Sequence, residues 1–189
     1  MRKQVKNTES LIVANDWKYG THSEKIRGEL LKEQNSICTY TETYFGRSDT
    51  RDIEHFDPKL KNTDRDSYHN WFLVKHQWNI EKASKWDKFQ PILHPTDDNF
   101  EERIIYENGY YDFKIGDIEA ENLIKLLKLD DLELARERNE YINGHKEDIE
   151  ELGMTAQTYF ERLLKRKPNQ VYFIRAIEEE FNIKIALTN

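Results

Sequence analysis

The stretch RDIEHFDPK, residues 51–59, places an acid and an imidazole side by side, Glu54 and His55. Residues 51–56 are typical of a β-strand, and Pro58 ends it because proline cannot donate to a sheet ladder. Neighbouring strand residues point to opposite faces, so the two side chains cannot both be buried in one apolar core. A carboxylate and a histidine at a strand end therefore indicate a functional site.

Phosphodiester hydrolysis is a reaction that such residues can support. A neutral imidazole with an ordinary pKa of about 6.5 can take a proton from water at neutral pH. One divalent cation, Mg²⁺ or Mn²⁺, can relieve charge on the phosphate and the leaving oxygen, and it prefers oxygen ligands. Glu54 offers a carboxylate and Asn79 an amide oxygen, which leaves positions for phosphate and water.

The elements around these residues are predicted from hydrophobic spacing and turn residues. A helix over 22–36 precedes short extended pieces around a turn at Gly46. The strand at 51–56 follows, then a polar loop and an aromatic, irregular stretch. A short helix is predicted to begin near Asn79.

The second half is predicted to hold a hairpin and several helices. Asn108-Gly109 lies between two β-prone runs and is a pair favoured in type I′ turns. Asp117 is predicted to cap a helix, and further helices are expected at about 132–150, 155–166 and 169–182. We expect an α+β fold, in which residues 1–114 form the core with an N-terminal helix and the hairpin. Residues 115–189 would form an acidic helical extension, packed with the core as one unit.

The order of Glu54-His55, Asn70, Asn79 and Lys82 resembles the motif of the HNH endonucleases, which have a ββα-metal site. The tracts IEHFDPK, PILHPTDDNFEERIIYENGYY and AENLIKLLKLDDLELARERNEYI resemble, more narrowly, the HNH nuclease subunits of Septu-type and retron-associated phage-defence systems. This resemblance covers about residues 37 to 142.

The resemblance implies an endonuclease with a ββα-metal core, acting on nucleic acid and most favourably on DNA. His55 would be the general base, and Glu54 and Asn79 would bind the Mg²⁺ or Mn²⁺ ion. Asn70 would hold the loop that carries His55, and Lys82 would approach a phosphate oxygen. The implied partner is an ABC/SMC-like ATPase subunit.

Each of these residues also has an ordinary structural interpretation. A strand histidine is often a surface or hydrogen-bonded residue, and Asn70 and Asn79 can be a turn cap and a helix N-cap. Glu54 and Lys82 can be two surface charges. His76 is a competing metal ligand. The alternative function, from another class, is a catalytically silent HNH-fold adaptor that binds nucleic acid or an ATPase partner.

The sequence departs from the family at its cysteines. Many relatives carry two Cys-x-x-Cys pairs that hold a structural zinc, but only Cys38 remains here. Thr41, Lys75 and Trp78 occupy the other positions. Because a zinc site needs about four N or S ligands, we expect no structural zinc.

Charge is divided unevenly along the chain, which has a net charge of -7. Residues 1–90 carry 16 Lys/Arg against 14 Asp/Glu, and residues 91–189 carry 13 against 22. Anion contacts are therefore expected in the first half, and weak nucleic-acid binding by the isolated chain. The single cysteine fits a reducing cytoplasm, and neither a signal peptide nor a membrane span is predicted.

The last predicted helix carries an apolar stripe. In VYFIRAIEEEFNIKIAL, Phe173, Ile174, Ile177 and Phe181 lie at helical spacing. The stripe is either a docking surface for the ATPase or part of the core of the protein, and the pattern alone does not separate the two.

Overall fold

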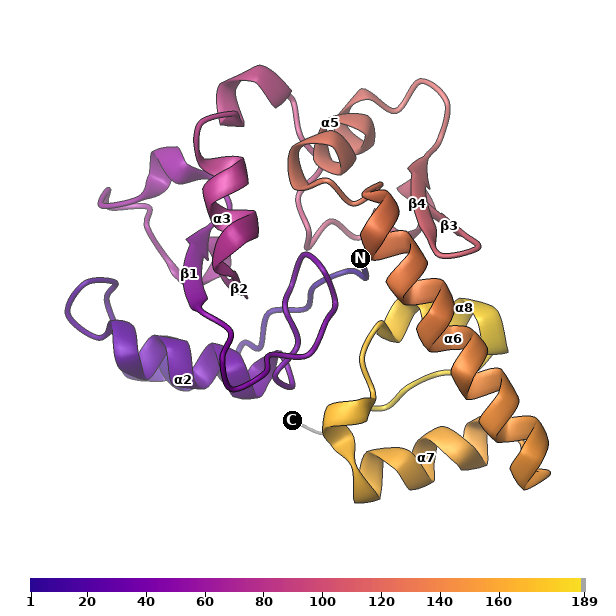
Figure 1. Ribbon diagram of the computed structural model, residues 1–189. Coiled ribbons are helices and arrows are strands. Elements are labelled where there is room, and N and C mark those ends of the chain that lie inside the picture. Colours follow the sequence, from indigo (N-terminus) through magenta and orange to yellow (C-terminus); the bar gives the residue numbers. More distant parts are fainter. Residues whose placement is uncertain (188–189) are drawn as a thin grey trace.

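The computed structural model describes residues 1–187 and shows an α+β fold with two small antiparallel sheets (Figure 1). One sheet pairs β1 (Arg51–His55) with β2 (Trp71–Lys75), and the other pairs β3 (Ile104–Glu107) with β4 (Tyr110–Phe113). The α-helices are α1 (Leu11–Ala14), α2 (Ser23–Glu33), α3 (His76–Ala83), α4 (Phe100–Arg103), α5 (Ile118–Leu127), α6 (Leu132–Leu152), α7 (Ala156–Arg166) and α8 (Ile174–Phe181). Within residues 1–187, no helix combines the length and the apolar character that crossing a membrane would need.

The first sheet is covered on both sides. In Figure 1, α3 lies against β1 and β2 and α2 runs below them, and both helices contact both strands. Four successive residues of β2, 71–74, are therefore buried and apolar. This explains why the stretch seemed irregular in the sequence: a strand buried on both faces loses the alternation that marks a half-exposed strand.

The direct connection from β2 to α3 sets where α3 begins. β2 runs directly into α3 at His76, so Asn79 is the fourth residue of the helix and not its first. The pairing extends from Arg51 opposite Lys75 to His55 opposite Trp71. The end of β1 therefore lies beside the start of β2.

The predicted hairpin is confirmed. Asn108 has φ +48° and Gly109 has φ +85°, and a type I′ turn requires positive φ at both central residues. A Cβ atom on Gly109 would lie 2.7 Å from the Ala135 carbonyl oxygen and from the Asn139 side chain. Glycine is needed here for the turn and for the close approach of α6.

Other helix boundaries follow local backbone geometry. α2 ends at Glu33, before its predicted end at 36, because Asn35 and Ser36 have positive φ. The predicted helix at 169–182 begins only at Ile174, after the short 3₁₀ helix Pro168–Gln170. The predicted Asp117 cap of α5 is confirmed, since its side chain accepts a hydrogen bond from the Ala120 N–H.

The buried apolar side chains form two clusters. The first extends from the N-terminal segment through both sheets to Leu129 and includes the buried face of α5. The second lies between α6, α7 and α8 and also takes in Ile37. The change of cluster follows Leu129, within the predicted helical extension of residues 115–189.

The apolar stripe of the last helix belongs to the second cluster. Phe173, Ile174 and Ile177 are at most 1% exposed, and Phe181 packs against them. Expecting a docking surface at this stripe was wrong, and the interpretation as core is correct. The stripe has a partner already, namely α6 and α7.

Candidate active site

A cavity of about 520 Å³ lies at the end of β1. Four of the five residues singled out in the sequence line it: Glu54, His55, Asn79 and Lys82. Its other walls are Tyr19, Ser23, Arg27, Asp52, Ile53, Pro58 and Lys61. The pairing of β1 with β2, followed at once by α3, is what brings these four residues together.

His55 is held by a carboxylate that the sequence did not single out. The Nε2 atom of His55 lies 3.2 Å from the Asp66 carboxylate, and both side chains are buried. Asp66 also accepts hydrogen bonds from the Trp71 indole at 2.5 Å and from the Asn62 N–H at 3.0 Å. Because an ionised carboxylate only accepts hydrogen bonds, the proton of the neutral ring belongs on Nε2, which leaves Nδ1 as the basic nitrogen.

Burial governs the charge of His55. Removal from water lowers the pKa of the imidazole below its usual 6.5, and the Asp66 carboxylate acts in the opposite direction. The Tyr19 ring meets the imidazole edge-on, with 4.5 Å between centroids. His55 is therefore neutral at pH 7, the state that a general base requires.

Glu54 and Lys82 form a buried ion pair. Their side chains are 4% and 2% exposed, and the Lys82 ammonium donates to Glu54 Oε1 and, at 2.9 Å, to the His55 carbonyl. The Tyr40 hydroxyl donates to the same carboxylate oxygen at 3.3 Å. Burial raises the pKa of Glu54 and lowers the pKa of Lys82, while their mutual attraction opposes both shifts. Lys82 thus neutralises Glu54 from inside the protein, whereas the resemblance implies that it approaches a phosphate.

A second group of polar side chains joins β1 to α3. Asn79 Nδ2 donates to Asp52 Oδ2 at 2.8 Å, and His76 Nδ1 lies 2.7 Å from the same oxygen. This interaction leaves Asn79 Oδ1 as the amide atom available to a cation. Asp52 lies two residues before Glu54 on β1, so both carboxylates face the same side of the sheet.

The oxygen donors at the cavity are of the type that Mg²⁺ prefers. Asp52, Glu54 and Asn79 supply two carboxylates and one amide oxygen, and Mg²⁺ commonly uses one or two carboxylates with several waters. Within residues 1–187, no group of three or more His, Cys, Asp or Glu side chains is clustered closely enough to hold a metal by itself. The donor set fits a hydrated hard cation and not a closed zinc site.

Asn70 lies outside the cavity and shapes the loop after His55. Its side-chain oxygen accepts from the Asp57 N–H at 2.8 Å, and its amide donates to the Asp57 carbonyl at 2.9 Å. Its own carbonyl accepts from the Phe56 N–H. Asn70 thus holds the segment that follows His55.

Of the four positions at which the resemblance implies cysteines, Cys38 and Lys75 are in contact. The Lys75 N–H donates to Cys38 Sγ at 3.3 Å. Thr41 shares a hydrogen bond with Thr43 at 2.7 Å, and Trp78 packs against both hydrophobic clusters. These residues thus take part in hydrogen bonds and aromatic packing.

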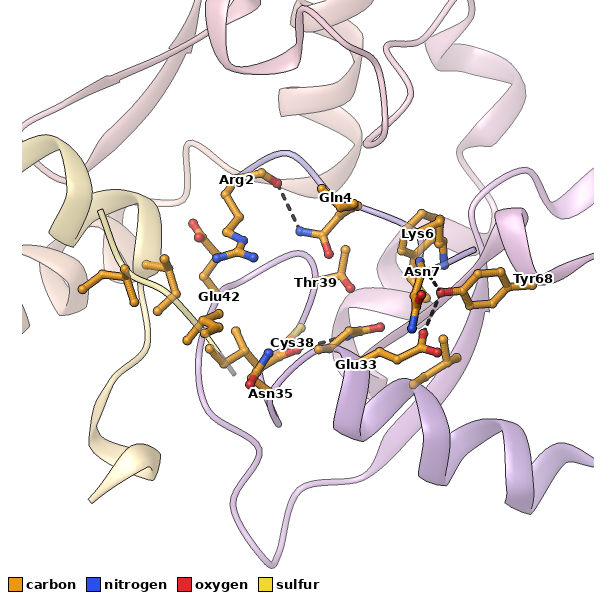
Figure 2. Close-up of a pocket in the computed structure, with 18 of the residues that line it drawn as sticks. Arg2, Gln4, Lys6, Asn7, Glu33, Asn35, Cys38, Thr39, Glu42 and Tyr68 are labelled. Carbon is orange, nitrogen blue, oxygen red and sulfur yellow. Dashed lines mark hydrogen bonds between the residues drawn. The ribbon is translucent and has the colours of Figure 1, made fainter. Parts of the chain in front are cut away.

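A separate cavity of about 530 Å³ lies between the N-terminal segment and α2 (Figure 2). There the Tyr68 hydroxyl donates to Glu33 at 2.7 Å and accepts from the Asn7 N–H. Burial lowers the pKa of Lys6 to about 7, and its ammonium lies over the Phe72 ring. None of the five predicted site residues lines this cavity, so it is distinct from the one at His55.

No family model, curated protein or solved structure matches this chain, so its function has to be inferred from the side chains themselves.

Proposed function

We propose that this chain is a metal-dependent endonuclease of the HNH type, which hydrolyses phosphodiester bonds of nucleic acid. Its ββα-metal core would be β1, β2 and α3. The observation that carries the proposal is a buried, neutral His55 on an Asp66 carboxylate, in one cavity with oxygen donors suited to Mg²⁺. The antiphage role and the ATPase partner suggested by the resemblance belong to the same proposal.

Each residue of the site has a distinct role in the proposed hydrolysis. Asp66 fixes the Nε2–H tautomer of His55, and Nδ1 takes the proton of the attacking water. Asp52, Glu54 and Asn79 would hold Mg²⁺ or Mn²⁺, which when bound neutralises charge on the phosphate and leaving oxygen. Tyr40 and Lys82 orient Glu54, and Asn70 keeps the loop after His55 in place.

The principal test is magnesium-dependent nicking of plasmid DNA by the purified chain, compared with nicking by His55→Ala. One observation favours the silent-adaptor alternative, because Lys82 already supplies Glu54 with a cation. Nucleic-acid binding without metal-dependent cleavage would support the adaptor. Cleavage that depends on both the metal and His55 would support the nuclease.

Asn79→Ala is expected to raise the Mg²⁺ concentration for half-maximal activity about tenfold, since it removes one oxygen ligand. Mn²⁺, which binds such ligands more tightly, should restore part of the activity. The measurement is initial rate against metal concentration. Gln77→Ala changes an exposed amide on the same helix and should leave the curve unchanged. An unaltered metal dependence in Asn79→Ala would exclude Asn79 as a ligand.

Asp66→Asn is expected to lower the maximal rate at least about tenfold, because the tautomer and orientation of His55 are no longer fixed. Loss of the negative charge should also lower the pKa of His55 further, since Asp66 raises it. The acidic limb of the rate profile should then move to lower pH. Rate against pH measures both effects, and Asp64→Asn, an exposed acid in the same loop, is the control. A parallel loss of rate at every pH with no displaced limb would argue against this role.

A further inference from the structure

Part of the cavity wall comes from segments outside β1, β2 and α3. Tyr19 lies in the turn before α2, and Lys61 lies in the loop that follows β1. The Lys61 ammonium lies 5.1 Å from the centroid of the Tyr19 ring, and that ring meets His55 edge-on. An aromatic ring and a cation therefore stand together beside the proposed base.

His55 is more deeply buried than this pair. Its side chain is 4% exposed, whereas Lys61 is exposed. Because Tyr19 and Lys61 line the same cavity as His55, a phosphate that reaches the imidazole comes close to both. Duplex DNA is stiff, with a persistence length of about 50 nm, and the protein would have to deform it to bring one phosphate into a recess. A single strand bends freely between nucleotides and needs no such deformation.

The charge around the cavity also disfavours a duplex. Lys82 is buried against Glu54, and Lys59 is paired with Asp87. Arg27, which also lines the cavity, is paired with Glu24, so Lys61 is the lining cation for which the described residues show no ion pair. Tight binding of a duplex requires the neutralisation of many phosphates. A single strand can gain affinity from stacking on an aromatic ring as well as from a few cations.

We infer that the cavity takes a single nucleic-acid strand in preference to a duplex, with Tyr19 stacking on a base and Lys61 contacting a phosphate. This inference rests on the proposed function and names its substrate class. DNA and RNA single strands share the chemistry that the two residues recognise.

The test uses the full chain carrying His55→Ala, so that binding is measured without cleavage. Fluorescence anisotropy compares a labelled single-stranded DNA 12-mer, the RNA of the same sequence and the corresponding DNA duplex. At least one of the two single strands should bind at least about tenfold more tightly than the duplex. The strand that binds more tightly shows whether the site prefers deoxyribose or ribose. Adding Tyr19→Ala should weaken strand binding about tenfold. Adding Lys61→Ala should reduce the slope of log affinity against log salt by about 0.7.

Two matched variants control for general effects. Tyr110→Ala removes an exposed tyrosine of the β3–β4 hairpin, and Lys165→Ala removes an exposed lysine of α7; both should bind as the parent does. Duplex binding as tight as strand binding would overturn the inference, as would unchanged binding in both Tyr19→Ala and Lys61→Ala.

Cleavage by the wild-type chain tests the proposed nuclease activity separately from the proposed preference for a single strand. His55-dependent cutting of duplex in preference to strand would uphold the nuclease and overturn the preference for a strand. Strand binding through Tyr19 and Lys61 without metal-dependent cutting would uphold the strand site and overturn the nuclease. Absence of any nucleic-acid binding would overturn both.

Discussion

His55→Ala is expected to lower the rate of Mg²⁺-dependent cleavage by about 10²- to 10⁴-fold, which is the contribution of a positioned general base. The substitution removes the histidine that Asp66 orients and that burial favours in its neutral form. The measurement is the initial rate of plasmid nicking and of cleavage of a labelled single strand, at saturating metal.

His69→Ala is the matched control, because His69 is exposed and lies close in sequence to the same sheet. It should retain the wild-type rate. Circular dichroism of both variants establishes that any loss is chemical and not a loss of fold. Full activity of His55→Ala with metal bound would remove His55 from the mechanism.

Lys82→Met is expected to lower the free energy of unfolding by about 3–5 kcal/mol, the usual cost of leaving a buried charge without its partner. The affected charge is the Glu54 carboxylate, which is 4% exposed and has Lys82 as its cation. Urea denaturation at pH 7 measures the change.

The double variant Glu54→Gln/Lys82→Met completes a thermodynamic cycle. Because it removes both charges, it should recover much of the stability lost in Lys82→Met. Lys85→Met, a neighbouring lysine without this partner in the structure, should change stability by less than about 0.5 kcal/mol. A loss below about 1 kcal/mol in Lys82→Met would show that the pair is not buried in solution.

Local signals in the sequence were sufficient for several elements. The Asn108-Gly109 turn and the Asp117 cap depend on the backbone preferences and hydrogen bonds of a few adjacent residues, and both were predicted correctly. β2 was harder to recognise, because burial on both faces removed its alternation. Prediction from sequence was therefore correct where the interactions that determine an element lie between residues that are close in the chain.

The same limit applies to the site. Glu54, His55, Asn79 and Lys82 share a cavity, as their order around two strands and a helix suggested. Asp66 was missed because nothing in NTDRD distinguishes it from Asp64; only the folded loop brings it to His55. The burial of Lys82 was missed for a related reason, since a lysine on a short helix is usually exposed.

The stripe on α8 shows a different limit. Apolar residues at helical spacing indicate that one face is covered, but they carry no information on what covers it. Here the covering elements come from the same chain. A partner that binds the C-terminal half must therefore contact residues other than this stripe.

The two hydrophobic clusters are joined at Trp78, one residue before Asn79, and at Tyr106, since both side chains pack against both clusters. Hydrogen bonds also connect the two regions. The Arg175 guanidinium donates to the carbonyls of Glu101 and Ile104, and the Phe173 N–H donates to the Glu42 carbonyl. The cavity at His55 is therefore joined to the C-terminal helices by packing and hydrogen bonds. A partner subunit that binds the acidic helices would therefore orient the whole molecule, including the cavity. The way in which that subunit binds would set the direction from which a substrate approaches.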